Sequence, residues 1–383
     1  MSDEISKFLN ERIAAGDFPS AVYLVAEKGE IVLHEALGHG VVEPELIEGR
    51  KDTIYDLASL TKVVVTGLLS SQLVGAGKLD PDAPVGKYLG EFKGSGKEQI
   101  TVRHLLAHTS GLAAWKPFYL LLDQPQHIVE NITFAPLDYE TGSSVVYSDA
   151  NFILLGQIVE EIYSEKLDQI VEDEISNHLG LRNTSFRPKM EDRLHIAACE
   201  KGNAFERQTC VEQGYLVDPG SLSENPVAIA PGSDPFRTDV IWGEVHDGNA
   251  YFMGGVAGHA GLFSTAEEVF KIAQQFLPNY TKLLKPETCE IFQTNFTPGM
   301  NEHRSFAFQL ASTPESTAGT KMSPECFGHL GFTGTSLWID PVKERVFILL
   351  TNRTHNHGLP FVNINSVRRV FHDMAIDFLD RNH

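Results

Sequence analysis

Strand-like stretches near both ends of the chain, with helical patterns between them, constrain the fold more than any other feature of the sequence. Residues 20–26 and 31–37 are largely aliphatic and flank a turn at Gly29, which predicts a β-hairpin. Residues 336–339 and 346–350 predict two more strands near the carboxyl end. Toward both ends the chain is therefore expected to contain β structure, while its middle is largely helical.

Apolar residues recur at helical spacing in much of the remaining chain. The predicted helices span residues 4–16, about 16 residues from Leu60 onward, 101–111, 150–162, 165–178, 266–276 and 363–380. From about residue 183 to 260 the periodicity is lost, and we expect loops that form the walls of a cleft. The glycine-rich stretch 254–265 does not fit a dinucleotide-binding fingerprint, and no strand clearly precedes it.

Ser59 and Lys62 form a Ser-x-x-Lys pair at the predicted start of the helix that follows. Residues three apart lie on one face of a helix, so a hydroxyl and an amine are presented together. A serine hydroxyl is a poor nucleophile until a base accepts its proton, and a lysine whose pKa is lowered by burial can do so. The N–H groups of the first turn favour an oxyanion beside Ser59. The spacing alone also fits a capping serine and a surface lysine, so further motifs have to decide.

The charge of the chain argues against two classes of partner. Lys plus Arg number 31 and Asp plus Glu number 51, and the net charge of −20 disfavours nucleic acid or an anionic membrane. Residues 1–7 have neither a basic n-region nor an apolar h-region, and no apolar run approaches the ~20 residues that span a bilayer. We therefore expect a cytoplasmic protein.

The cysteines and histidines give no strong metal signature. The cysteines form no close pairs, so buried free thiols are expected instead of a metal site or a disulfide framework. They are Cys199, Cys210, Cys289 and Cys326. His104 and His108 are four apart on a predicted helix, but without a third ligand we expect packed or capping side chains. His355 and His357 are an equally weak pair, and we predict neither a metal nor a cofactor.

Three motifs occur together in the order and rough spacing of a known superfamily. They are Ser59-x-x-Lys62, Tyr147-Ser148-Asp149, and His329-Leu330-Gly331 followed by Phe332-Thr333-Gly334-Thr335. The chain resembles the serine β-lactamase and penicillin-binding superfamily, and in detail the class C β-lactamase-related group, which includes esterases, D-amino-acid peptidases and muropeptide amidases. The resemblance covers nearly the whole chain and is carried by residues 20–38, 100–112, 147–156, 255–265 and 328–341.

The resemblance implies a β-lactamase/transpeptidase-like fold of α/β plus all-α class, in which helices flank an antiparallel sheet and a helical domain is inserted. We expect residues 1–58 and 255–383 to form the α/β domain with the antiparallel sheet. Residues 59–254 are expected to form a mainly helical domain with long cleft-lining loops. The active site is expected between the two domains.

The resemblance also implies roles for single residues. Ser59 would be the acylated nucleophile, Lys62 its partner and Tyr147 a second base. His329 stands where class C enzymes have a lysine, and the backbone N–H groups of Ser59 and Phe332 would form the oxyanion hole. The positions next to the site are Asp149, Gly331 and Thr333.

Two departures from the family pattern affect the chemistry. Asp149 replaces the usual asparagine, and a carboxylate near Lys62 favours the charged amine, which leaves open whether Lys62 or Tyr147 is the main base. Asp149 is alternatively the N-cap of the following helix. His329 leaves a weaker, pH-dependent cation for a substrate carboxylate, so esters or small amides are better expected substrates than β-lactams.

The expected protein is a serine hydrolase that cleaves esters or amides of small substrates through an acyl-enzyme at Ser59. A muramoyl-L-alanine amidase of cell-wall recycling is an alternative, because residues 246–265 resemble that group. A β-lactamase, or a penicillin-binding sensor without turnover, is a third. The partner is accordingly a small ester, amide or muropeptide, and the sequence leaves its identity and the oligomeric state open.

Overall fold

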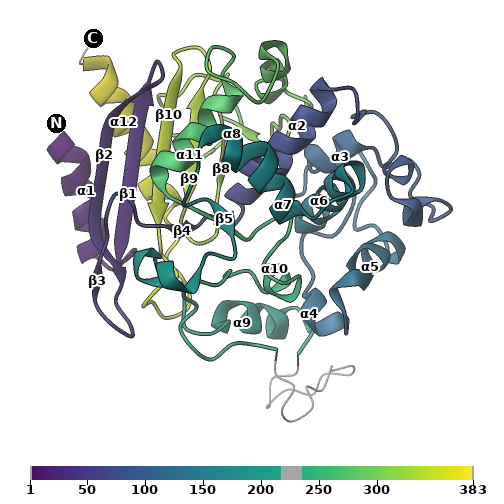
Figure 1. The fold of residues 1–383 in the computed structure, drawn as a ribbon, viewed down its shortest axis with the longest axis horizontal. Helices are drawn as coiled ribbons and strands as arrows, with labels where there is room; N and C mark the ends of the chain where they lie inside the picture. Colours follow the sequence, from purple (N-terminus) through teal and green to yellow (C-terminus); the bar gives the residue numbers. More distant parts are fainter. Residues whose placement is uncertain (1, 217–234, 382–383) are drawn as a thin grey trace.

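The computed structural model describes residues 2–216 and 235–381, and a seven-stranded antiparallel sheet lies at one side of the molecule (Figure 1). Strands from the two ends of the chain meet inside it, where β1 pairs with β10 from Ala21↔Thr351 to Glu27↔Arg345. In sheet order, the strands are β3 (Ile47–Glu48), β2 (Glu30–Val41), β1 (Ser20–Glu27), β10 (Arg345–Thr351), β9 (Ser336–Asp340), β8 (Phe327–Leu330) and β7 (Gln309–Leu310). A small second sheet joins β4 (Tyr55–Asp56), β6 (Leu262–Ser264) and β5 (Ser185–Phe186).

Helices cover both faces of the large sheet and fill the rest of the molecule (Figure 1). The α-helices are α1 (Ser2–Ala14), α2 (Leu68–Gly75), α3 (Val102–Leu106), α4 (Phe118–Leu121), α5 (Ile128–Phe134), α6 (Asp149–Tyr163), α7 (Leu167–Val171), α8 (Asn177–Leu179), α9 (Ala204–Glu212), α10 (Gly248–Phe252), α11 (Ala266–Ala273) and α12 (Asn365–Arg381). The π-helical segments are η1 (Lys62–Gly67) and η5 (Glu172–Ser176), and the 3₁₀ segments are η2 (Val85–Lys87), η3 (Gly90–Phe92), η4 (Pro125–His127), η6 (Met190–His195), η7 (Gln274–Phe276) and η8 (Pro286–Phe292).

The two faces of the sheet belong to two hydrophobic cores. Side chains alternate along a strand, so Val22 and Leu24 of β1 pack in the large core with the helices around Ser59. Tyr23 and Val25 point to the opposite face and pack with residues of α1 and α12. Burial on both faces explains why the sequence of β1 is almost continuously apolar. It also fixes the register of this strand in the sheet.

The predicted fold class is confirmed, as are most of the predicted elements. The hairpin, the two late strands and the terminal helices all form within a few residues of their predicted bounds. Thr265 caps α11 by accepting a hydrogen bond from the Glu268 N–H, and Thr101 caps α3 in a capping box with His104. All four cysteines are buried and free, as expected.

Two predictions about local structure are wrong. The helix predicted to end at Gly111 already ends at Leu106, and His108 has a left-handed φ of 57°. The stretch predicted as irregular contains α9 and α10, whose short apolar patterns did not reveal them, while its part at 217–234 lies outside the described residues. The glycine-rich stretch 254–265 ends in the strand β6, which its sequence pattern does not predict.

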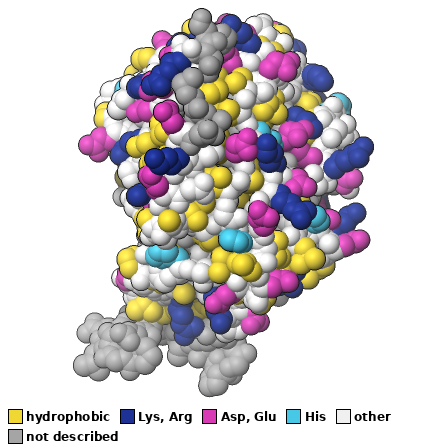
Figure 2. Space-filling model, turned by 90° about the vertical axis from the view of Figure 1, so that its left-hand side faces the viewer, with side chains coloured by type: hydrophobic (Ala, Val, Ile, Leu, Met, Phe, Trp, Pro, Cys, Tyr) yellow, Lys and Arg dark blue, Asp and Glu magenta, His cyan; other side chains and the backbone are white. Residues whose placement is uncertain are grey.

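The outer face that carries α1 and α12 has acidic and basic side chains interspersed, so the net charge of −20 is not gathered there in one patch (Figure 2). Within the described residues, none of the helices combines the length and the apolar character that crossing a bilayer requires. The cytoplasmic location stays a prediction.

Candidate active site

Ser59 lies in a tight turn between β4 and the helical segment η1. The turn places Ala58 at a φ of 46°, a strained conformation for a residue with a Cβ. The buried carboxylate of Asp56 holds this turn, because its oxygens accept hydrogen bonds from the N–H groups of Ala58 at 2.8 Å and His246 at 2.7 Å. The nucleophile candidate is thus presented by a rigid backbone that the preceding strand fixes.

Lys62 lies directly beside Ser59 and is completely buried. Its Nζ donates to Ser59 Oγ at 2.9 Å and to the His259 carbonyl at 3.0 Å, and it lies 2.7 Å from Asp149 Oδ1. These three oxygens match the three donors of an ammonium group. The structure therefore brings Ser59, Lys62 and Asp149 into one hydrogen-bonded chain.

The Lys62–Asp149 pair decides the charge of the lysine. Burial alone would lower the pKa of Lys62, but the Asp149 carboxylate, together with Tyr147, raises it above its ordinary value. Lys62 is therefore an ammonium at neutral pH. The alternative for Asp149 is wrong, because Ser148 is the N-cap of α6 and Asp149 is its first helical residue.

Tyr147 stands over this pair from the turn before α6. Its ring centroid lies 4.9 Å from Lys62 Nζ and 4.7 Å from the ring centroid of the buried His108. Burial raises the pKa of the Tyr147 hydroxyl, and the lowering effect of Lys62 does not offset that rise. Its buried hydroxyl makes no hydrogen bond of regular geometry with any described residue. Tyr147 is therefore a protonated phenol next to Ser59.

His329 lies on β8 and lines the same cavity as Ser59 and Tyr147, but it is not a cation. Its Nδ1–H donates to the Leu330 carbonyl at 2.8 Å, which leaves Nε2 as an acceptor without a partner among the described residues. Burial, with the nearby charges of Arg304 and Lys62, holds the pKa of His329 well below its ordinary value. The predicted role of a pH-dependent cation is therefore corrected, because this imidazole is neutral.

The turn after β8 approaches the Ser59 turn closely. The hydroxyls of Thr333 and Thr335 donate to the carbonyls of Asp56 at 2.7 Å and Leu57 at 3.0 Å. A Cβ on Gly331 would lie 2.0 Å from Thr335 Oγ1 and 2.5 Å from the Leu57 carbonyl oxygen, so only glycine fits there. Gly331 and Thr333 thus act in holding two turns together.

The two N–H groups predicted for the oxyanion hole belong to these joined turns. Among the described residues, neither the Ser59 nor the Phe332 N–H is used in a backbone or side-chain hydrogen bond. Free N–H donors beside a nucleophile are what an oxyanion requires. The geometry is thus compatible with the predicted hole.

Sequence reasoning missed the arginines that line the cavity. Arg304 is 5% exposed, lies 5.6 Å over the Tyr147 ring and pairs with Glu302, but its Nε and Nη1 have no partner among the described residues. Arg368 donates to the carbonyls of Gly331 and Thr335. These arginines sit in irregular sequence or on the terminal helix, so no motif points to them.

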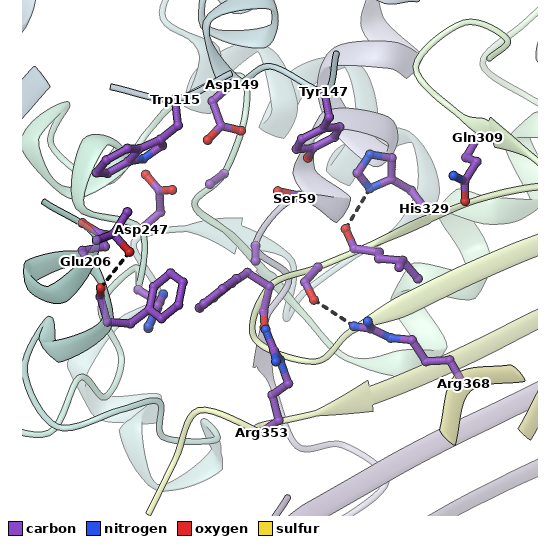
Figure 3. A pocket seen from close by; sticks show the side chains of 18 of the residues that line it. Ser59, Trp115, Tyr147, Asp149, Glu206, Asp247, Gln309, His329, Arg353 and Arg368 are labelled. Carbon is purple, nitrogen blue, oxygen red and sulfur yellow. Dashed lines mark hydrogen bonds between the residues drawn. The ribbon is translucent and has the colours of Figure 1, made fainter. Parts of the chain in front are cut away.

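The cavity has a volume of about 470 Å³ and opens over Ser59 (Figure 3). Figure 3 shows Trp115, Asp149, Glu206 and Asp247 on one side of Ser59, whereas His329, Gln309 and Arg368 lie on the other. The complete lining is Ala58, Ser59, Trp115, Tyr147, Asp149, Phe205, Glu206, Thr209, Gln213, His246, Asp247, Ala260, Arg304, Gln309, His329, Leu330, Gly331, Phe332, Arg353 and Arg368. The residues from 205 to 247 come from the stretch predicted to line a cleft.

One group of side chains has the spacing of metal ligands. Single donor atoms of Asp149, Asp247 and His259 lie within 4.8 Å of one another. Asp149 is already paired with the Lys62 ammonium, and Asp247 with His259 Nε2 at 3.0 Å. These pairings account for both carboxylates, and the absence of a metal or cofactor stays a prediction.

A serine hydroxyl bonded to a buried lysine, with a tyrosine and a third motif across the cavity, is the arrangement that the predicted superfamily requires. A family model described as Beta-lactamase matches residues 5–369. The chain belongs to the beta-lactamase family. It is a serine hydrolase of this superfamily, as its sequence predicts.

Individual relatives agree with this assignment. A protein named "Putative D-alanyl-D-alanine carboxypeptidase" from Escherichia coli (strain K12) is 31% identical over 92% of this chain and 82% of its own length. A protein of the same name from Salmonella agona (strain SL483) is 33% identical, over 94% and 84%.

Solved structures share the fold at lower identity. EstCE1, a hydrolase with promiscuous acyltransferase activity, has a TM-score of 0.71 at 20% identity and covers 97% of both chains. A class C beta lactamase has a TM-score of 0.71 at 16% identity, covering 98% of this chain and 97% of its own.

Proposed function

We propose that this beta-lactamase-family chain hydrolyses ester or amide bonds of small, carboxylate-bearing substrates through an acyl-enzyme at Ser59. The 2.9 Å hydrogen bond from Lys62 Nζ to Ser59 Oγ, inside a cavity of about 470 Å³, carries the proposal. A cavity of that size suits a small ester or a short peptide rather than a polymer. Relatives named for carboxypeptidase activity support a peptide-like substrate.

The proton of Ser59 needs an acceptor, and the charged Lys62 cannot serve alone. Lys62 first passes one proton to Asp149, 2.7 Å away, and then takes the Ser59 proton as Ser59 Oγ attacks the carbonyl carbon. Both transfers take place within existing contacts, so no group has to move. The pair Lys62–Asp149 is in this scheme the base, and Asp149 ends the step protonated.

The protonated Tyr147 then supplies the proton that the leaving group requires. Its raised pKa keeps the proton on the phenol until the bond to the leaving oxygen or nitrogen breaks. Lys62 returns a proton to Tyr147 and recovers one from Asp149, which restores the starting charges. Water releases the acyl group by the same steps in reverse, and the N–H groups of Ser59 and Phe332 stabilise the oxyanion.

Arg304 is the group that supports a carboxylate on the substrate. It is buried, lines the cavity 5.6 Å over the Tyr147 ring, and has two nitrogen atoms without partners among the described residues. A buried guanidinium with free donors binds carboxylates well, whereas the neutral His329 provides no charge.

A kinetic comparison tests the proposal. Wild type, Ser59→Ala and the exposed control Ser143→Ala are assayed with p-nitrophenyl acetate, a peptide ending in D-alanyl-D-alanine and a muramoyl peptide. We expect turnover of at least one substrate, a fall of about 10³-fold or more in Ser59→Ala, and no change in Ser143→Ala. A turnover rate in Ser59→Ala equal to that of wild type would refute the assignment of Ser59 as the nucleophile. A penicillin adduct that persists for hours without turnover would favour a sensor.

A further inference from the structure

The carboxylates and the arginines that line the cavity come from different parts of the fold. The acidic ones, Asp149, Glu206 and Asp247, come from α6, α9 and the start of α10. The arginines Arg304, Arg353 and Arg368 come from the segments around the strands β7 to β10 and from α12. Figure 3 shows the acidic group together with Trp115 at one end and Arg368 toward the other. A cavity with two oppositely charged ends orients a substrate that itself carries charge.

The three carboxylates differ in whether they have a counter-ion. Asp149 pairs with Lys62, and Asp247 pairs with His259. Glu206 is 6% exposed, and its Oε1 accepts from the Gly248 N–H at 2.8 Å. Its Oε2 is buried next to Gly248 and Tyr119 and makes no hydrogen bond of regular geometry within the described part of the chain. Among the residues that the structure describes, Glu206 is thus the acidic group at this end that has no cation at bonding distance.

The electrostatics of Glu206 are those of a carboxylate that lacks a counter-ion. Burial, with a further contribution from Asp247, raises the pKa of Glu206 to about 7, although His246 and the Tyr119 hydroxyl lower it in part. Leaving a buried polar atom unsatisfied is costly, so a group kept in this state on a cavity wall is a candidate for a ligand contact.

Aromatic rings stand beside this carboxylate. Trp115 lies at the same end of the cavity as Glu206 (Figure 3), and Phe205, which directly precedes Glu206 on α9, also lines the cavity with its ring 4.7 Å from that of Phe332. An ammonium group gains from a carboxylate and from the faces of aromatic rings, whereas a carboxylate or phosphate is repelled at such a place. The combination therefore favours a cation over an anion or a neutral group.

We propose that Glu206, with Trp115 and Phe205, forms a subsite for an ammonium group of the substrate. Together with Arg304 at the other end, it selects amino-acid or peptide derivatives that carry both a free amine and a carboxylate. The proposal rests on the proposed hydrolase function for its biological meaning, but the subsite itself is a binding property. Glu206 is a specificity-determining residue in this account and takes no part in proton transfer.

Binding measurements test the subsite independently of hydrolysis. Benzylammonium, benzyl alcohol and benzoate are titrated calorimetrically into wild type, Glu206→Gln and Glu212→Gln. The Glu212 side chain is exposed on the same helix and bonds Gln208, so its variant removes an equal charge outside the cavity. Glutamine keeps an oxygen for the Gly248 N–H, and the melting temperature of each variant checks that the fold is retained.

We expect wild type and Glu212→Gln to bind benzylammonium at least about tenfold more tightly than benzyl alcohol, and Glu206→Gln to lose that preference. Equal affinities in wild type, or a preference that survives in Glu206→Gln, would overturn the proposal. Benzylammonium should also inhibit p-nitrophenyl acetate hydrolysis competitively, and noncompetitive inhibition would place the cation elsewhere. If wild type hydrolyses no substrate, the proposed function fails while the titration still decides on the subsite.

Discussion

Replacing Asp149 by asparagine removes the partner that keeps Lys62 charged. Lys62 is completely buried and the Asp149 side chain is 16% exposed, so solvent screens their pair little. Removing one partner of a buried pair costs about 3 kcal/mol or more. Since unfolding entropy is about 2.1 cal/mol/K per residue, a loss of about 3 kcal/mol lowers the Tm of a 383-residue chain by about 4 °C.

The pH dependence of the stability difference follows from the direction in which the pKa of Lys62 is shifted in wild type and in Asp149→Asn. In wild type, the raised pKa of Lys62 gives stability that is present below the unfolded pKa of about 10.4 and is lost only at higher pH. In Asp149→Asn, burial dominates and the pKa of Lys62 falls below its unfolded value. The stability deficit of this variant should therefore be largest at low pH and shrink as the pH approaches about 10.

The activity of Asp149→Asn should also be lowest near neutral pH and recover as the pH rises. At pH 7 we expect kcat of Asp149→Asn to fall about 100-fold, because Lys62 has no acceptor for its proton, and to recover in part as rising pH deprotonates Lys62. Stopped-flow rates and thermal melts between pH 6 and 9.5 measure both effects, with the exposed Asp123→Asn as control. A wild-type kcat in Asp149→Asn at pH 7, or a loss that does not change with pH, would refute the proton transfer to Asp149.

Three further variants test other parts of the site. Tyr147→Phe keeps the ring but removes the proposed acid, so kcat on amides should fall about 100-fold while labelling by a fluorophosphonate, which has a good leaving group, is largely retained. Arg304→Met should raise KM at least about tenfold for a carboxylate-bearing ester and leave that for a neutral ester unchanged. Gly331→Ala should lower stability by about 1–3 kcal/mol in a thermal melt, because its Cβ would lie 2.5 Å from the Leu57 carbonyl oxygen. Unchanged values in these assays would contradict the respective roles.

The fold was predictable because its signals are local and repeated. The aliphatic stretches of β1 and β10 are buried on both faces, so each reads as a strand without knowledge of its partner. Capping residues such as Thr101 and Thr265 indicate in the sequence where a helix begins. In contrast, α9 carries few apolar residues and is held by tertiary contacts, so its pattern gives no signal.

The candidate site was predictable in its motif residues but not in their charges. The structure brings Ser59, Tyr147 and His329 to one cavity and Lys62 into contact with Ser59. The neutral state of His329, however, depends on burial and on Arg304, 25 residues earlier in the chain. Such environments arise from contacts between distant segments. The same holds for Glu206, because no sequence pattern reveals that its Oε2 is left without a regular hydrogen bond among the described residues.

The most direct test of the account is to identify the residue that becomes acylated. Protein mixed with a reactive ester is quenched within the first turnover, digested and mapped by mass spectrometry. We expect one acyl group on the peptide that contains Ser59, faster formation in wild type than in Asp149→Asn, and no adduct in Ser59→Ala. An acyl group on another residue, or steady hydrolysis without any adduct at Ser59, would contradict it.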